Sequence, residues 1–185
     1  MANSRQTTGE TPLSKNREQI IKEAQRMEES LLFTSKGHFA AADFWAKFHL
    51  WIGIPMVVLS AILSASAFSQ FDSKHLIAGF ISLLVVAMSS IMTFLNPNDK
   101  LRGHLSAGNN ADSLMNNIRV FWSIDCWQEA SEQVLTSRLK KFSDDKAKIN
   151  HSSPRIPRWA YKSAKRAIAD GEGEYSVDKK TIKDF

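Results

Sequence analysis

The sequence of 185 residues contains a single cysteine, Cys126. One thiol excludes a disulfide framework within the chain and any cysteine-based metal cluster. A lone thiol is typical of proteins in a reducing compartment, or of membrane proteins that face one. The five histidines lack metal-ligand spacing, so we predict neither a metal site nor a cofactor: His38, His49, His75, His104 and His151.

Recognisable catalytic motifs are also missing. The sequence has no GxxxxGK[ST] phosphate-binding loop, no GxSxG nucleophile elbow and no HExxH metalloprotease motif. We therefore predict no catalytic residues and no enzymatic activity. The residues before Leu31 include no apolar run of the kind found in a signal peptide, so membrane insertion has to use an internal segment.

Two internal segments, Phe48–Phe68 and Leu76–Leu95, contain no Asp, Glu, Lys or Arg. A helix of about 20 residues is about 30 Å long, which matches the hydrocarbon core of a bilayer. The polar turn at 69–75 makes the two helices antiparallel. The alternative is a buried hairpin inside a soluble bundle, but soluble helices usually carry a charged stripe, and neither segment has one. The sequence therefore predicts a two-span transmembrane hairpin.

Basic residues around the hairpin indicate its orientation. Lys36 and Lys47 precede the first span, Lys100 and Arg102 follow the second, and the turn carries only Lys74. Because cytoplasmic flanks carry the excess of Lys and Arg, we expect both termini in the cytoplasm.

Small residues gather on one face of each predicted span. Such residues let helices approach closely in lipid, and hydroxyl groups can bridge helices, so packing alone explains them. The alternative is that one stripe lines a water-filled pore in an oligomer. No ionisable residue lies deep in either span, which argues against a proton relay or a coupled transporter. The candidates are Gly53, Ser60, Ser64 and Ala67 in the first span, and Gly79, Ser82, Ser89, Ser90 and Thr93 in the second.

An amphipathic helix is predicted in the N-terminal part, residues 1–37. Its apolar residues recur at helical spacing, and Pro12 suits the first helical position. We expect the residues TSKG at 34–37 to break this helix. The aromatic-rich segment that follows is typical of a membrane interface and leads into the hairpin, residues 38–95.

A second helix is expected after the hairpin, within residues 96–149. Asn96 suits its N-cap and Pro97 its first position, and the helical pattern continues without a break to about Phe142. Its apolar stripe must pack on the N-terminal helix or on copies of itself, and we infer self-assembly. The oligomerisation candidates are Ala107, Ala111, Leu114, Ile118 and Phe121. Asp125 interrupts this pattern and is either exposed or paired at an interface.

The C-terminal part, residues 150–185, is basic. It reads as a linker, a short amphipathic helix near Trp159 and a flexible tail. A basic segment of this kind suits anionic lipid, nucleic acid or an acidic partner, or it is simply solvated. The short helix can lie on the membrane surface, dock a partner or cover the same bundle. The predicted fold class is thus an all-α membrane protein.

Residues 94–119, FLNPNDKLRGHLSAGNNADSLMNNIR, resemble the SLATT family. In that family the second span ends in a short polar stop, followed by a histidine with small residues and then by a further helix. The resemblance in layout covers roughly residues 15–150. The matching positions are Pro97, His104, Ala107, Leu114 and Arg119.

This resemblance implies a bacterial inner-membrane effector of an anti-phage, abortive-infection system. Such effectors are encoded beside nucleotide-second-messenger synthases or other sensors, and they are thought to assemble and perforate the membrane. The implied partners are the lipid bilayer, other copies of the chain and such a sensor system, with no direct contact to nucleic acid. Two alternatives stay open. One is a non-channel membrane anchor that recruits a soluble partner, and the other is a phage-type holin, although holins are usually shorter.

Overall fold

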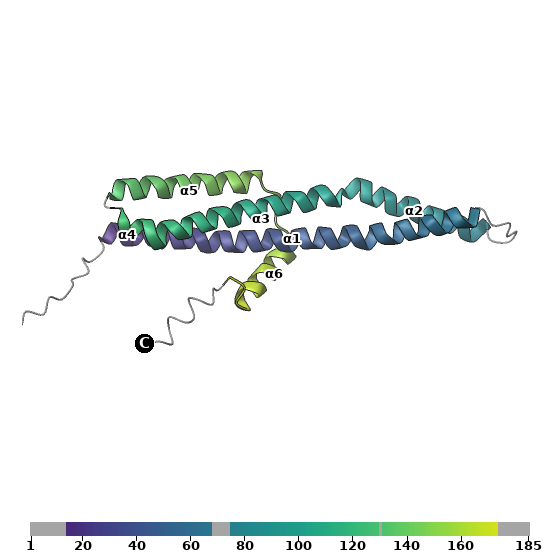
Figure 1. Cartoon of the computed structure of the whole chain (residues 1–185), viewed down its shortest axis with the longest axis horizontal. Coiled ribbons are helices and arrows are strands. Elements are labelled where there is room, and N and C mark those ends of the chain that lie inside the picture. Colours follow the sequence, from purple (N-terminus) through teal and green to yellow (C-terminus); the bar gives the residue numbers. More distant parts are fainter. Residues whose placement is uncertain (1–13, 68–74, 130, 174–185) are drawn as a thin grey trace, which may run out of the picture.

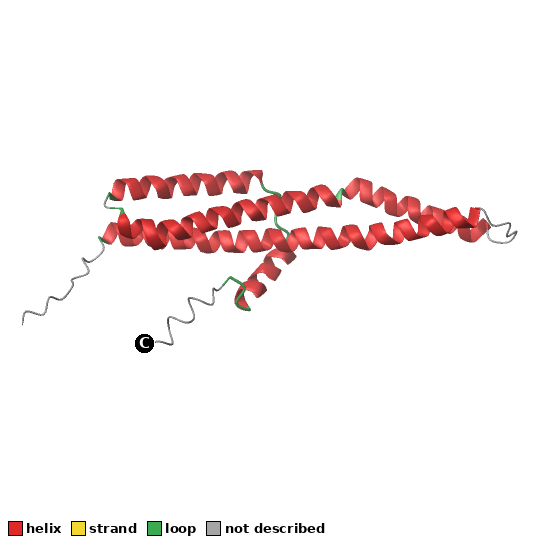
Figure 2. Ribbon diagram, viewed as in Figure 1, coloured by secondary structure: helices red, strands yellow, loops and turns green. Residues whose placement is uncertain are grey.

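The computed structural model describes residues 14–67, 75–129 and 131–173. All regular structure in these ranges is helical, as Figure 2 shows, which confirms the all-α prediction. The helix start at Pro12, the turn between the two apolar segments and the tail from residue 174 lie outside the described residues.

Helix α1 (Lys15–Ala67) is a single helix of 53 residues, about 80 Å long at 1.5 Å per residue. The break predicted at 34–37 is wrong, because the helix passes through these residues without interruption. The hydroxyl of Thr34 donates to the carbonyl of Ser30 at 2.8 Å, so this polar residue is satisfied inside the helix. Gly37 has a tertiary role, since a Cβ there would lie 3.2 Å from the side chain of Ile156.

Helix α2 (His75–Leu95) runs back along the end of α1 and forms the hairpin (Figure 1). The helix is followed by Asn96, whose φ of 41° places it in the left-handed region. Asparagine is one of the few residues that tolerate this conformation. Helix α3 (Pro97–Val120) then begins with proline in its first turn. The predicted stop and restart are therefore confirmed.

Beyond the hairpin, α3 runs antiparallel to α1 and continues through a π-helical turn, η1 (Phe121–Asp125), into α4 (Cys126–Gln128). The chain then turns, and α5 (Glu132–Ser152) folds back beside α3 and α1 (Figure 1). The expectation of one unbroken helix to Phe142 is thus wrong.

Folding back is favoured because it buries the apolar side of α5 on the core that α1 and α3 share. Leu135 is fully buried, and the ring of Phe142 packs 5.3 Å from that of Phe121. Asp125 forms an ion pair with Arg138 at 2.6 Å, which links the two sides of the turn. Of the two alternatives for Asp125, the structure shows pairing, and the partner lies within the same chain.

The apolar stripe of α3 is covered by α1 of the same chain, one of the two partners that the sequence allowed. The five residues predicted on this stripe are all buried, Phe121 and Ile118 completely. They contact the apolar stripe of α1, which the sequence also predicts. The shared core consists of Ile20, Ala24, Met27 and Leu31 from α1, Ala111, Leu114, Met115 and Ile118 from α3, and Phe121, Cys126 and Leu135 beyond them.

Helix α6 (Arg158–Ala169) packs on another side of α1 (Figure 1). Ala160 and Ala164 are buried in this contact, and the ring of Tyr161 stacks on that of Phe33 with 6.1 Å between centroids. Of the three predicted roles for this basic helix, the structure shows it as a surface helix of the bundle.

Gly108 of α3 makes room for the ring of Phe39 of α1. A Cβ at this position would lie 2.7 Å from Cε1 of Phe39 and 2.9 Å from its Cδ1, closer than packed carbon atoms come. In α3, Gly103 is different, because its Cβ would meet only Pro154, at an ordinary 3.7 Å. Gly108 is therefore required by packing, whereas Gly103 is not.

We predict that Gly108→Ala destabilises the protein by up to about 2 kcal/mol. Overpacking costs about 1–3 kcal/mol, and the better helix propensity of alanine returns about 1 kcal/mol. In a Phe39→Leu background the same change is expected to raise the melting temperature. Gly103→Ala is the matched control and should be neutral or stabilising. Thermal unfolding in detergent measures all four variants, and equal effects of the two alanines would contradict this account.

Candidate functional site in the membrane hairpin

The apolar segments of α1 and α2 are long and apolar enough to cross a membrane, and their most apolar windows have no residue buried within the chain. Large apolar side chains stand open on the hairpin surface. Trp51 is 80% exposed, Leu76 81% and Phe94 93%. In a soluble core helix these residues would be covered, so their exposure favours a lipid environment.

The half-buried positions of the two spans are mostly larger side chains, although they also include Gly53 and Ser60 of the small stripe. The half-buried positions recur at alternating three- and four-residue steps, which is the spacing of left-handed helix pairs. On α1 they include Ile52, Met56, Leu59 and Leu63, and on α2 they are Ala78, Ile81, Val85, Met88, Met92 and Leu95.

The small residues lie beside this contact. Successive residues of a helix are about 100° apart around its axis. By this count, the small residues point roughly 80° away from the half-buried residues on α1 and roughly 120° away on α2, in the same rotational sense. Because the helices are antiparallel, equal senses of rotation place both stripes on the same side of the hairpin. We call this the small-residue side. The opposite side carries bulky residues such as Trp51, Val58, Ile62, Phe80, Leu84 and Ile91.

On the small-residue side, the glycines have open space around them and the hydroxyls bond within their own helix. A Cβ at Gly53 or Gly79 would meet nothing within 4 Å. The hydroxyls donate to carbonyls one turn earlier in their own helix, a pattern that satisfies them in lipid. These bonds are Ser60 to Met56 at 2.8 Å, Ser64 to Ser60 at 2.9 Å, Ser82 to Ala78 at 2.8 Å, Ser90 to Val86 at 2.8 Å and Thr93 to Ser89 at 3.0 Å. Ser89 is exposed on α2, and Ala67 is the last residue of α1.

His49 is a residue that sequence analysis did not connect with the hairpin surface. It lies between the span contact and the small-residue side, near the start of the first span. Among the described residues, its Nδ1 is the buried side-chain polar atom that has no hydrogen-bond partner. A buried polar atom without a partner costs about 1–3 kcal/mol, so this position favours a further polar group at the same surface. Only the pairing of α1 with α2 reveals this placement.

A pair of histidines links α1 to α3 outside the apolar spans. The Nδ1 atoms of His38 and His104 lie 3.0 Å apart, and both side chains are buried. One ring donates and the other accepts, so the accepting Nδ1 must carry no proton, and two charged rings cannot form this bond. Burial, with the charge of His104 next, lowers the pKa of His38 to about 4. Burial and then Lys100 lower the pKa of His104.

Among the described residues, no group of three or more His, Cys, Asp or Glu side chains lies together in a way that could hold a metal ion. Cys126 is buried, and desolvation raises the pKa of its thiol, which makes it a poor nucleophile.

We predict that stability falls in acid because of the histidine pair. The pKa of His38 is about 4 in the folded chain against an ordinary value of 6.5, so between these values the unfolded chain binds more protons. Going from about pH 7.5 to about pH 5 should cost about 2 kcal/mol, or roughly 4–8 °C in melting temperature.

The double variant His38→Leu/His104→Leu should lose this acid sensitivity, and His151→Gln, at an exposed histidine, should keep it. Melting temperatures at the two pH values decide the matter. An unchanged pH dependence in the double variant would show that other groups are responsible.

Comparison with known proteins gives one family. The family model for the SMODS and SLOG-associating 2TM effector domain family 4 matches residues 18–180. No curated protein and no solved structure matches the chain. The matched range runs from the first turn of α1 to beyond the end of α6, and its description as a two-span effector agrees with the two exposed apolar helices. The chain therefore belongs to the SMODS and SLOG-associating 2TM effector domain family 4, a family of two-span membrane effectors.

Proposed function

We propose that the chain is an oligomeric effector that permeabilises the bacterial inner membrane as part of an anti-phage system. In this proposal both termini lie in the cytoplasm, as the basic flanks predict. Hairpins associate through the small-residue side, and the bulky side faces lipid. The family description supports the effector role and the association with SMODS and SLOG partners, which would supply the trigger.

The observation that carries this proposal is the two-sided hairpin. Small residues and hydroxyls from both spans share one side, which is mostly exposed, and a Cβ at Gly53 or Gly79 would meet nothing within 4 Å. Close helix approach in membranes uses such residues. Each hydroxyl keeps acceptor capacity after its bond to the backbone, so it can contact a neighbouring hairpin or water.

The position of His49 supports the same surface. Its unpartnered Nδ1 lies at the edge of the small-residue side, where a second hairpin or pore water would supply a partner. The stripe of α3, by contrast, is already buried by α1 within one chain. The surface proposed for self-association is therefore in the membrane rather than on that stripe.

We predict that Ser82→Leu or Ser89→Leu reduces membrane depolarisation about tenfold or more while the protein still inserts. A bulky side chain at a close helix contact costs about 1–3 kcal/mol, and 1.4 kcal/mol is a factor of ten. Ala87→Leu is the matched control, because Ala87 is also small and exposed but lies away from the small-residue side.

Each protein is expressed in bacteria, either by itself or together with the neighbouring sensor genes, and a voltage-sensitive dye reports the membrane potential after induction. Fractionation confirms that the protein is in the membrane. Purified full-length protein in dye-loaded liposomes separates pore formation from indirect effects. Full activity of the Ser82→Leu and Ser89→Leu proteins would rule out this side as the working surface.

A second candidate, a membrane anchor that recruits a soluble partner, is favoured by a different surface. Val120, Ile124 and Trp127 form an exposed apolar row at the end of the bundle far from the membrane, and Trp127 is 60% exposed. If the chain is only a membrane anchor, we expect no ion flux in liposomes at any protein density. It also predicts that Trp127→Ser abolishes recruitment of the partner without changing insertion.

A further inference from the structure

We propose that the start of α6, together with the adjoining part of α1 and α3, binds the headgroup of an anionic phospholipid. The surface consists of Phe44, Lys47, Lys100, Arg158 and Trp159, and we call it the headgroup site. This inference concerns lipid binding outside the spans and does not depend on pore formation.

Three segments of the chain lie at the same level along α1, and together they form the headgroup site. The rings of Phe44 and Trp159 are 4.9 Å apart, which places the first turn of α6 against α1. The ammonium group of Lys100 lies 4.7 Å from the ring centroid of Trp45, which brings the start of α3 to the same level of α1. Phe48, the first residue of the apolar span, joins this aromatic cluster at 5.6 Å from Trp45.

Distance along α1 places the cluster in the headgroup layer. Residues 44–47 lie within about 6 Å of Phe48 at 1.5 Å per residue. The layer between hydrocarbon and bulk water is about 5–7 Å thick on each side of a bilayer. Aromatic side chains prefer this layer, because their rings are apolar at one end and polar at the other.

The charges of the site are available for a ligand. Lys47, Lys100 and Arg158 are exposed, and none of them forms an ion pair with another described residue. The acidic groups nearby are Asp43, one turn from Lys47, and Asp99, next to Lys100. The first turn of α6 also has no side-chain cap, so its free N–H groups add to the positive potential.

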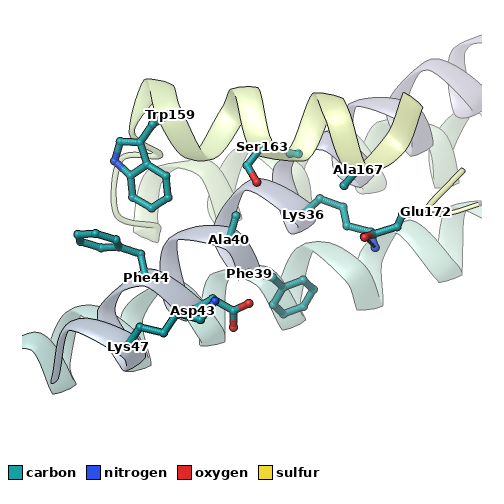
Figure 3. Close-up of a pocket in the computed structure, with 11 residues that line it drawn as sticks. Lys36, Phe39, Ala40, Asp43, Phe44, Lys47, Trp159, Ser163, Ala167 and Glu172 are labelled. Carbon is teal, nitrogen blue, oxygen red and sulfur yellow. Dashed lines mark hydrogen bonds and ion pairs between the residues drawn. The ribbon is translucent and has the colours of Figure 1, made fainter. Parts of the chain in front are cut away.

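A groove between α1 and α6 extends away from the site. It has a volume of about 430 Å³, and Figure 3 shows Phe44, Lys47 and Trp159 at one end and Lys36 and Glu172 at the other. Lys36 is neutralised there by Glu172 at 2.8 Å, so unpaired positive charge is concentrated at the membrane end. This uneven distribution of charge along the groove favours binding of an anionic headgroup at the end near the bilayer.

The test uses the full-length chain in nanodiscs of phosphatidylcholine. The discs contain either phosphatidylglycerol or phosphatidylcholine brominated on the upper acyl chain, at the same mole fraction. Bromine quenches nearby tryptophan, and the difference between wild type and Trp159→Phe isolates the signal of Trp159. We expect the anionic lipid to quench Trp159 several times more than the neutral lipid, and salt to weaken this preference.

The variant Lys47→Gln/Lys100→Gln/Arg158→Gln should lose the preference, about fivefold for each charge removed. The matched control Lys22→Gln/Lys140→Gln/Lys141→Gln removes three exposed charges elsewhere and should keep it. Inorganic phosphate at equal ionic strength should not compete. Competition by phosphate, equal quenching by both lipids in the wild type, or equal loss in the control variant would each overturn the proposal.

If the neutralised variant fails to fold, as judged by its helical circular dichroism, the charge-conserving variant Lys47→Arg/Lys100→Arg/Arg158→Lys replaces it. This variant should retain the preference for phosphatidylglycerol. A wild-type protein without a salt-sensitive preference overturns the headgroup site in either case.

Discussion

The structure depends on the burial of one apolar stripe along α1. Ile20, Ala24, Met27 and Leu31 cannot be covered by α1 itself, and α3 and α5 supply the cover. This requirement sets the direction of α3, the return of α5 and the position of the histidine pair. Since α1 continues without a break into the membrane, the same helix also determines where the hairpin stands relative to the bundle.

Several features of the fold could be predicted from short stretches of the sequence. The spans follow from length and the absence of charge, and the junction between α2 and α3 follows from Asn96 and Pro97, which stop one helix and start another. The apolar stripes of α1 and α3 follow from helical spacing, and both are buried as expected. These features are encoded within a few turns of chain, where period and capping rules apply.

Features that depend on contacts between distant residues were missed. Thr34 and Gly37 looked like a helix break, but one bonds to its own helix and the other makes room for Ile156. The turn between α4 and α5 contains neither glycine nor proline, and Ser131, which occupies the N-cap position of α5, was not recognised as a helix start. His38 and His104 are 66 positions apart. The shared side of the small residues could be recognised only once the contact face of each span was known.

The two spans leave the membrane in different ways. α1 passes into the bundle as one helix, whereas α2 is joined to α3 through the left-handed residue Asn96. The first span is thus a direct continuation of the bundle, whereas the second is linked to it through one residue outside the helical conformation. We expect a movement of α3 relative to α1 to change the tilt of the second span more than that of the first.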